Sequence, residues 1–515
     1  MLEDINAKTW GINRRGFLIG AAAMAGPTPL LAATAPKKGG TFRMGVISGD
    51  VAQNLDPTST AGALDQMVQM MTRNGLVEIL PNGELGPELA ERWESDASLK
   101  KWTFFLRKGV TFHNGKTLTS ADVIYSIKHH LGENSKSPIK ATLGAVTSVA
   151  ADGPDRVVVE LSGPNADLPF VFGDYYMRII PDGATSFIDG NGTGPYALTS
   201  FEPGVRASGK RNPNYFKPDR AHFDAISLLV VADESARIAA LNTGQIDAMD
   251  RVGFKILPMV QNAPGIKVLE AIGRQHFNFP MLCDQAPFDN RDLRLAMKYG
   301  IDREAILKLV LNGRGYVGND HPIARNAKYF NSELKQRVYD PDRARFHLKN
   351  SGLAGTSLQL HVSEAAFAGA TDTGSLYKEA ASKAGINFEL VRAPNDGYWA
   401  KVWQKVPWFT SWWAGRPTED WMLTSTYAKG SPYNESHWSN DRFNQLLVAA
   451  RGESDEAKRR QMYWEMQQLI SDDGGTITPV FANYVTLVSA KIAYGDVSAM
   501  WILDGYKATE RWWFA

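Results

Sequence analysis

Strand-like and helix-like segments follow one another along most of this chain. Residues 41–46 alternate as a strand does, and apolar residues then recur at helical spacing within 63–76. A second strand pattern at 102–106 precedes a helix start at 119–127, and a third at 357–362 precedes another helix. This order predicts an α/β fold. Because 515 residues exceed what one hydrophobic core usually serves, we expect two or three domains.

Charge and cysteine content exclude several classes of function. The chain has 56 Lys and Arg against 55 Asp and Glu, so its composition gives no reason to expect nucleic acid as a partner. Its single cysteine, Cys283, rules out an intramolecular disulfide and a cysteine-based metal or redox centre. The glycine turn at 192–196 lacks the spacing and the lysine of a phosphate-binding loop. We therefore expect no metal and no cofactor.

The first 35 residues have the pattern of an export signal. Asn13–Phe17 contains two consecutive arginines, a mildly apolar run extends from Gly20 to Ala33, and small residues follow at 33–35. The apolar run is too short and too weak to span a membrane. The sequence therefore predicts a Tat-type signal peptide at 1–35 and a protein that works in the periplasm.

Phe409–Met422 combines three tryptophans with Gly415, Arg416 and two carboxylates. Tryptophan offers a large flat surface with one donor, and arginine offers a fork of donors that suits a carboxylate or phosphate. This composition predicts a pocket wall for an organic anion or zwitterion. The alternative is that the tryptophans belong to the core and that the arginine is solvated or forms a structural ion pair.

Several short motifs occur along the chain in a fixed order. They are Asn54–Pro57, Ala90–Trp93, Phe112–Gly115, Ala121–Val123, Gly192–Tyr196 and Pro287–Asn290 with Arg294. Taken together, they resemble family 5 of the bacterial extracellular solute-binding proteins, the peptide-, nickel- and opine-binding components of ABC importers. The resemblance covers nearly the whole chain after residue 36.

The resemblance implies a periplasmic-binding-protein-like fold, with two α/β lobes joined by two crossing segments and a hinge, and an extra inserted domain. Ligand is then trapped between the lobes by hinge closure, and the closed form docks on a membrane permease. The expected divisions are domain I at 36–80, 193–276 and 489–515, inserted domain II at 81–192, and domain III at 277–488.

Two positions depart from the peptide-binding members. In those members a Gly-Asp step provides the aspartate that pairs with the peptide ammonium, whereas this chain has Gly415-Arg416. After the strand that ends near Val362, several members carry an arginine for the peptide carboxylate, whereas this chain has Ser363 and Glu364. The resemblance therefore implies a site of reversed polarity, in which Arg416 binds an anion and Glu364 binds a cation or hydroxyl groups.

Alternatives remain for these side chains. Arg416 could instead form a structural ion pair with Glu364 or with Glu419. A core position is the commoner role for tryptophans such as Trp399, Trp408 and Trp438, and a histidine such as His437 is more often structural than ligand-binding. The predicted ligand-binding residues are Ser59, Thr60, Glu364, Phe367, Trp399, Trp412, Trp413, Gly415, Arg416, Asn434 and His437.

We expect a binding protein for a small opine-like, sugar-conjugate-like or peptide-like solute with an anionic group. Its partners would be that ligand and the permease of an ABC importer, and we expect a monomer. An ordinary di- or oligopeptide-binding protein is the alternative. A hydrolase is disfavoured because no nucleophile or zinc motif occurs and because Glu419 and Asp420 are adjacent in sequence. A metal-chelate carrier is disfavoured because the adjacent pair His129–His130 is expected on a helix surface.

Overall fold

The computed structural model describes residues 36–60 and 62–515, which belong to one compact unit. The predicted signal peptide at 1–35 lies outside the described residues. None of the helices in the described part is long and apolar enough to cross a lipid bilayer.

Among the described residues, nine strands form the largest sheet, in the order β16-β12-β17-β11-β1-β10-β9-β8, with β13 paired to β17. Strand β1 is parallel to β10 and to β11, and the other neighbours are antiparallel. The strands are β1 (Thr41–Val46), β8 (Tyr196–Glu202), β9 (Arg206–Arg211), β10 (Ala225–Val230), β11 (Ala248–Met249), β12 (Ile266–Pro280), β13 (Gly315–Val317), β16 (Ser411–Trp413) and β17 (Thr476–Ser489).

The remaining strands form smaller sheets. They are β2 (Val77–Ile79) with β3 (Leu85–Pro87), the parallel pair β14 (Leu358–Val362) and β15 (Phe388–Arg392), β18 (Ile492–Ala493) with β19 (Trp513–Phe514), and the antiparallel sheet β4 (Ala90–Ser95), β5 (Lys101–Leu106), β7 (Arg156–Leu161) and β6 (Val146–Ala151).

Helices cover these sheets, and several begin at a side-chain cap. Asn290 accepts from the N–H of Leu293 at 3.0 Å, and Asp302 accepts from the N–H of Ala305 at 3.0 Å. The helices are α1 (Ala63–Thr72), α2 (Ser120–Leu131), α3 (Leu168–Val171), α4 (Glu234–Asn242), α5 (Leu257–Val260), α6 (Arg291–Tyr299), α7 (Arg303–Leu309), α8 (Pro341–Ser351), α9 (Ala370–Ser382), α10 (Tyr398–Lys401), α11 (Glu419–Tyr427), α12 (Asp441–Gly452), α13 (Glu456–Asp473), α14 (Ile502–Gly505) and α15 (Ala508–Arg511), with 3-10 turns at Pro57–Ser59 and Thr142–Ala145.

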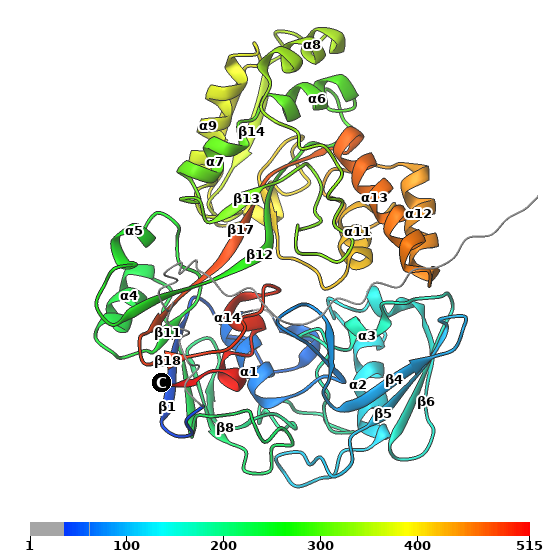
Figure 1. Ribbon diagram of the computed structural model, residues 1–515, viewed down its shortest axis with the longest axis vertical. Helices are drawn as coiled ribbons and strands as arrows, with labels where there is room; N and C mark the ends of the chain where they lie inside the picture. Colours follow the sequence, from blue (N-terminus) through cyan, green and yellow to red (C-terminus); the bar gives the residue numbers. More distant parts are fainter. Residues whose placement is uncertain (1–35, 61) are drawn as a thin grey trace, which may run out of the picture. The chain divides into compact units, whose positions relative to one another are not determined.

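Strands β12 and β17 are the longest in the described chain and run antiparallel to each other, from the pair Ile266–Ser489 to the pair Pro280–Thr476. Figure 1 shows them passing together from the strands around β11 to the helices around α7 and α13. Strand β17 pairs with β11 near its carboxyl end, at Leu487 and Val488, and with β13 at 480–482. These strands are the two crossing segments. The proposed domain boundary at 276–277 falls inside β12, and that at 488–489 falls at the last residue of β17.

The segment expected as an inserted domain contains the antiparallel sheet of β4, β5, β7 and β6. Trp102, Phe104 and Leu106 alternate along β5 and are all buried, as their spacing predicts. They pack with Val157 and Val159 of β7 in one hydrophobic cluster. This sheet therefore has a core of its own.

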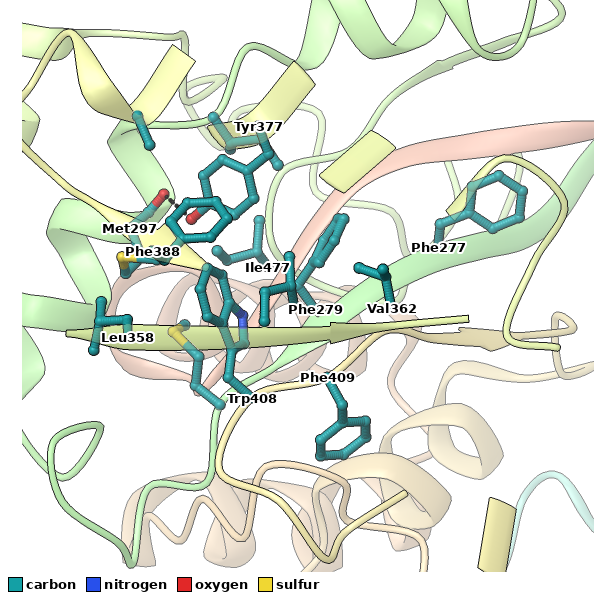
Figure 2. Packing of buried hydrophobic residues seen from close by; sticks show 14 of the residues in the cluster. Phe277, Phe279, Met297, Leu358, Val362, Tyr377, Phe388, Trp408, Phe409 and Ile477 are labelled. Atoms are coloured by element: carbon teal, nitrogen blue, oxygen red, sulfur yellow. Dashed lines mark hydrogen bonds between the residues drawn. The ribbon is translucent and has the colours of Figure 1, made fainter. Parts of the chain in front are cut away.

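A second core forms around Trp408, from residues between 277 and 409 together with Ile477, Val480 and Ala482 of β17 (Figure 2). Trp408 is completely buried, and its ring meets Phe388 edge-on at 4.8 Å and Tyr377 edge-on at 5.7 Å. The Tyr377 hydroxyl donates to the carbonyl of Met297 at 2.8 Å, so the polar end of this buried ring is satisfied. The predicted core position of Trp408 is confirmed.

A buried ion cluster joins the C-terminal helices to the region around β2 and β3. Its members are Glu78, Glu88, Glu510, Lys217, Lys507 and Arg511. Glu88 has no exposed surface and accepts from Lys507 Nζ at 2.5 Å and from Lys217 Nζ at 3.1 Å. The three glutamates bring carboxylate oxygens within 4.8 Å of one another. Arg178 also lies 3.9 Å from Glu88, and Asp504 lies 3.0 Å from Arg511, so four cations balance four carboxylates. The arrangement is that of a structural ion network, which joins segments far apart in sequence.

Candidate functional site

A cavity of about 370 Å³ lies where the carboxyl ends of parallel strands meet. Ile47 follows β1, Ala232 follows β10 and Arg251 follows β11, and all three residues line the cavity. From the other side, Glu364 and Phe367 follow the parallel strand β14 and line the same cavity. Ligands of open α/β sheets bind outside the carboxyl ends of strands, so this cavity is the candidate binding site.

Aromatic rings form much of the cavity wall. Phe277 of β12 and Phe367 stack with their ring centroids 4.0 Å apart. Trp412, in the middle of β16, contributes a half-buried indole. Trp501 and Tyr506, at either end of α14, stack with centroids 6.3 Å apart. Such a wall provides flat apolar surfaces on which a small organic molecule can pack.

Two arginines line the cavity, Arg237 and Arg251; Arg237 is buried and lies 4.0 Å from Asp250, whereas Arg251 faces the aromatic wall. Its guanidinium carbon lies 5.9 Å from the centroid of a Trp412 ring, and no described carboxylate forms an ion pair with it. Burial raises the pKa of the Tyr484 and Tyr506 hydroxyls, and the positive charge of Arg251 opposes that rise. Arg251 has a left-handed backbone with a φ of 45°, which is uncommon for a residue other than glycine. An arginine held over an indole, with donors to spare, suits a planar anionic group.

Three buried polar atoms in the cavity wall have no hydrogen-bond partner among the described residues; they belong to Arg237, Trp501 and Asn483. Arg237 Nε lies 4.0 Å from Asp250 Oδ1, its ion-pair partner. Trp501 is 5% exposed, and its Nε1–H has no acceptor. Asn483 is 9% exposed; its Nδ2 donates to Glu270 at 2.6 Å, while its Oδ1 receives no donor. Since buried polar groups are normally hydrogen-bonded to protein, water or ligand, the Trp501 donor and the Asn483 acceptor are candidate contacts for a molecule in the cavity.

Three of the predicted binding residues line the cavity, namely Glu364, Phe367 and Trp412. Glu364 also accepts from the N–H groups of Gly369 at 2.6 Å and Thr371 at 3.1 Å, at the start of α9. These two bonds hold the carboxylate in place. Its role towards a ligand stays a prediction.

Arg416 lies outside the lining of this cavity. Its guanidinium carbon is 5.3 Å from a Trp413 ring centroid, and the described residues include no ion pair to it. The alternative pairing with Glu364 or Glu419 is therefore absent from the described chain, and Glu419 instead accepts from the N–H of Tyr329 at 2.7 Å. Burial raises the pKa of the Asp174 carboxyl to about 6, and the positive charge of Arg416 opposes that rise.

Adjacent residues of β16 point to opposite sides. Trp412 lines the cavity, whereas Trp413 is buried in a cluster with residues of α11, α12 and α13. Gly415 lies against Arg274 of β12, whose Nη1 donates to the carbonyls of Arg416 and Pro417 at 3.3 Å. The close approach of the Arg274 side chain explains why the residue at 415 has no side chain.

Gly415→Ala should destabilise the protein. A Cβ at residue 415 would lie 2.2 Å from Arg274 Cβ, which cannot move without its backbone, so we expect a loss of about 1–3 kcal/mol in the free energy of unfolding. Urea unfolding followed by fluorescence measures this loss. Gly144→Ala is the matched control, since nothing lies within 4 Å of its added Cβ. Equal stability of the two variants would contradict the packing argument.

Ser59 and Thr60 do not line the cavity. Ser59 and Thr60 direct their hydroxyls to the carbonyl of Asp56, at 3.3 and 3.4 Å, and so stabilise their own turn. Asp56 also pairs with His129 at 2.9 Å. His130 is buried and bonded to the hydroxyl of Ser137 at 2.7 Å, so the expectation that both histidines lie on the helix surface was wrong for His130.

Asn434 and His437, in the loop after α11, and Trp399, in α10, also lie away from the cavity lining. Asn434 donates to the carbonyl of Trp438 at 2.8 Å, and His437 contacts Asp284 at 2.9 Å. Trp399 is 42% exposed, so its expected core position was wrong, whereas the core position of Trp438 is confirmed at 2% exposure. The ligand-binding roles of these residues stay predictions.

Comparison of the sequence with known protein families identifies the family of this chain. Residues 84–435 match the family described as bacterial extracellular solute-binding proteins, family 5 Middle. The chain belongs to this family. Its members are binding proteins of ABC importers, which take a small-molecule ligand and work with a membrane permease.

Individual relatives agree with that assignment. A probable peptide ABC transporter periplasmic-binding protein, y4tO of Sinorhizobium fredii, is 26% identical over 74% of this chain and 75% of its own. Among solved structures, AgaA of A. tumefaciens R10 in complex with agropinic acid has a TM-score of 0.79 at 22% identity, covering 92% of this chain and 99% of its own. MoaA of the same strain, in complex with mannopinic acid, has a TM-score of 0.75 at 22% identity, covering 93% and 99%. These likenesses establish the two-lobe fold.

Sequence reasoning missed Arg251, Asn483, Trp501 and Tyr506. A signal for Arg251 existed, because it comes two residues after a short strand in an α/β region, where ligand-binding residues commonly occur. Trp501 and Tyr506 come from the far C-terminal segment, which no local pattern connects to β14 or β16.

Proposed function

We propose that this chain is a periplasmic solute-binding protein whose ligand is a small organic solute with an anionic group, held in the 370 Å³ cavity. Arg251 carries this proposal, because it lies over the Trp412 ring in the cavity wall and forms no ion pair with residues 36–60 or 62–515. The donor Nε1–H of Trp501 in the same wall fits a second oxygen of such a group. We propose no catalytic step.

The cavity size favours a compact ligand. Small-molecule sites usually measure about 300–1,000 Å³, so 370 Å³ suits a single small conjugate or a dipeptide better than a long peptide. Opines and related sugar conjugates combine carboxylates with hydroxyl groups, and agropinic and mannopinic acids are the ligands of two structural neighbours. We therefore place opine-like conjugates first and di- or oligopeptides second.

The twin-arginine pattern within residues 1–35 and the periplasmic relatives support export to the periplasm. Residues from both sides of β12 and β17 line the cavity, which supports ligand capture by closure of two lobes. The closed form would then deliver the solute to the permease of an ABC importer.

Thermal unfolding with a defined panel tests the proposed ligand class. Agropinic acid, mannopinic acid and neutral and acidic dipeptides are added separately to the purified protein. A ligand at about 100 times its dissociation constant should stabilise the protein by about 2.7 kcal/mol. Stabilisation by opines supports the first choice, and stabilisation by dipeptides alone supports the second. No stabilisation by any anionic compound would reject the proposal, and chemical change of a bound compound in mass spectra would indicate an enzyme.

A further inference from the structure

An ion pair joins two separate hydrophobic cores of the molecule. Asp167 directly precedes α3, whose Leu168 and Val171 are buried in one cluster with residues of β5 and β7. Arg459 lies in α13, whose Tyr463 is buried in another cluster with residues of α11 and α12. The Nη2 of Arg459 donates to Oδ2 of Asp167 at 2.7 Å. Two parts of the chain with their own cores are thus held together by opposite charges.

Backbone and apolar contacts surround this ion pair. The N–H of Ala166 donates to the carbonyl of Arg451 at 3.1 Å. Pro164 lies so close to Gly452, at the end of α12, that a Cβ at residue 452 would lie 2.5 Å from Pro164 Cγ. Trp421 of α11 packs against the cluster of β5 and β7. These residues form the distal contact, with 164–167 on one side and Trp421, Arg451, Gly452 and Arg459 on the other.

The distal contact joins the two lobes away from the crossing segments β12 and β17. Asp167 comes before β12 begins, whereas Arg459 lies between the end of β12 and the start of β17, so the two sides belong to opposite lobes. Figure 1 shows the turn between α12 and α13 close to α3, to the right of both strands. When lobes rotate about crossing segments, the regions farthest from those segments move most. The distal contact therefore forms on closure and breaks on opening.

The charges of the distal contact balance when its two sides meet. Arg459 pairs with Asp167, and Arg451 pairs with Asp420 of α11 at 3.2 Å. Burial raises the pKa of the Asp420 carboxyl to about 6; Arg451 opposes that rise, and the nearby Asp167 increases it. The side chains of Arg459 and Asp167 keep 9% and 13% exposure, so water can replace either partner when the sides separate. The contact can thus form and break reversibly.

We propose that the distal contact is a latch that stabilises the closed arrangement of the two lobes. This inference rests on the lobe closure of the proposed function, but not on the identity of the ligand. Neither Asp167 nor Arg459 lines the 370 Å³ cavity. The latch therefore changes the population of the closed form without touching the solute, and the apparent affinity for any solute that requires closure follows that population.

Hydrogen exchange at single amides of the purified protein, without ligand, tests the latch. The Ala166 amide donates across the contact to Arg451, whereas the neighbouring Asn165 amide donates to the carbonyl of Leu99, on its own side, at 3.0 Å. Exchange at Ala166 therefore measures separation of the two sides, and exchange at Asn165 is the internal reference. Asp167→Asn should speed exchange at Ala166 about tenfold and leave Asn165 unchanged, since a hydrogen bond between charged groups changes an equilibrium by roughly this factor.

Gly452→Ala opens the same contact without changing a charge. The added Cβ meets Pro164 only while the two sides are together. When they are apart, alanine suits the helical end of α12 at least as well as glycine does. Exchange at Ala166 should again rise about tenfold, with Asn165 unchanged, because the extra methyl group overpacks the closed form alone.

Arg442→Gln is the matched control, because it removes an exposed ion pair between α12 and α13 and should leave both amides unchanged. A wild-type Ala166 amide that exchanges as fast as an unstructured one would overturn the latch. Unchanged exchange at Ala166 in both Asp167→Asn and Gly452→Ala would do the same. Equal acceleration at Asn165 would indicate local unfolding in place of lobe separation and would also overturn it. None of these outcomes bears on the ligand panel, which tests the proposed function separately.

Discussion

Glu88→Ala should lower the free energy of unfolding by about 3–5 kcal/mol, the loss typical of breaking a buried ion pair. Glu88 is fully buried and accepts from Lys507, Lys217 and the side-chain amide of Asn74, the last at 2.9 Å. The alanine would leave two ammonium groups in the buried ion cluster with too few carboxylates. Denaturant unfolding of the purified protein measures the change.

An exposed ion pair gives the matched comparison. Glu94 pairs with Arg92 at the surface, so Glu94→Ala should cost less than about 1 kcal/mol. A Glu88→Ala variant as stable as Glu94→Ala would contradict the importance of the buried ion cluster.

The same cluster predicts how stability depends on pH. Burial would raise the pKa of Glu510, but Lys217 and Lys507 outweigh burial and lower it from 4.5 to about 2. A carboxyl with a lowered folded-state pKa stabilises the protein fully above its unfolded-state pKa. That contribution is then lost as the pH falls from about 4.5 towards about 2. The stability of Glu88→Ala, whose cluster is already broken, should fall less over this range.

Arg251→Ala should weaken binding of an anionic ligand by about 10- to 150-fold, since a hydrogen bond to a charged group contributes about 1.5–3 kcal/mol. Arg251 lies at the carboxyl end of β11, over the Trp412 ring, and forms no ion pair with any described residue. Its fold-stabilising contacts are therefore few, and the unfolding midpoint without ligand should stay close to that of the wild type. Calorimetric titration with agropinic or mannopinic acid measures the affinity.

Arg416→Ala separates the two candidate anion anchors. Arg416 was the anchor expected from the sequence, but its side chain lies over Trp413 and outside the cavity lining. We therefore expect Arg416→Ala to change the affinity by less than about threefold, within the scatter of indirect effects. A large loss with Arg416→Ala and none with Arg251→Ala would reverse the assignment.

The fold could be predicted because its determinants are local. The order of strand and helix patterns indicated an α/β protein, and a set of ordered motifs indicated the two-lobe family, which the match over residues 84–435 confirms. Alternation along β5 correctly identified Trp102, Phe104 and Leu106 as buried. Such patterns depend on backbone periodicity, which neighbouring residues fix without help from the rest of the chain.

The identity of the cavity residues depends on contacts that sequence does not contain. Trp412 and Trp413 look alike in the sequence, but successive side chains of a strand point to opposite faces, and only the pairing of β16 with β12 decides which tryptophan faces the cavity. Arg416 lies beyond that strand, where the packing of Gly415 against Arg274 sets the course of the backbone. Thus the sequence alone predicted a ligand-binding site that contains tryptophan and arginine. The tertiary structure decided that Arg251, more than 150 residues away in sequence, lies over Trp412, because β11 and β16 each join the sheet that β12 and β17 hold together.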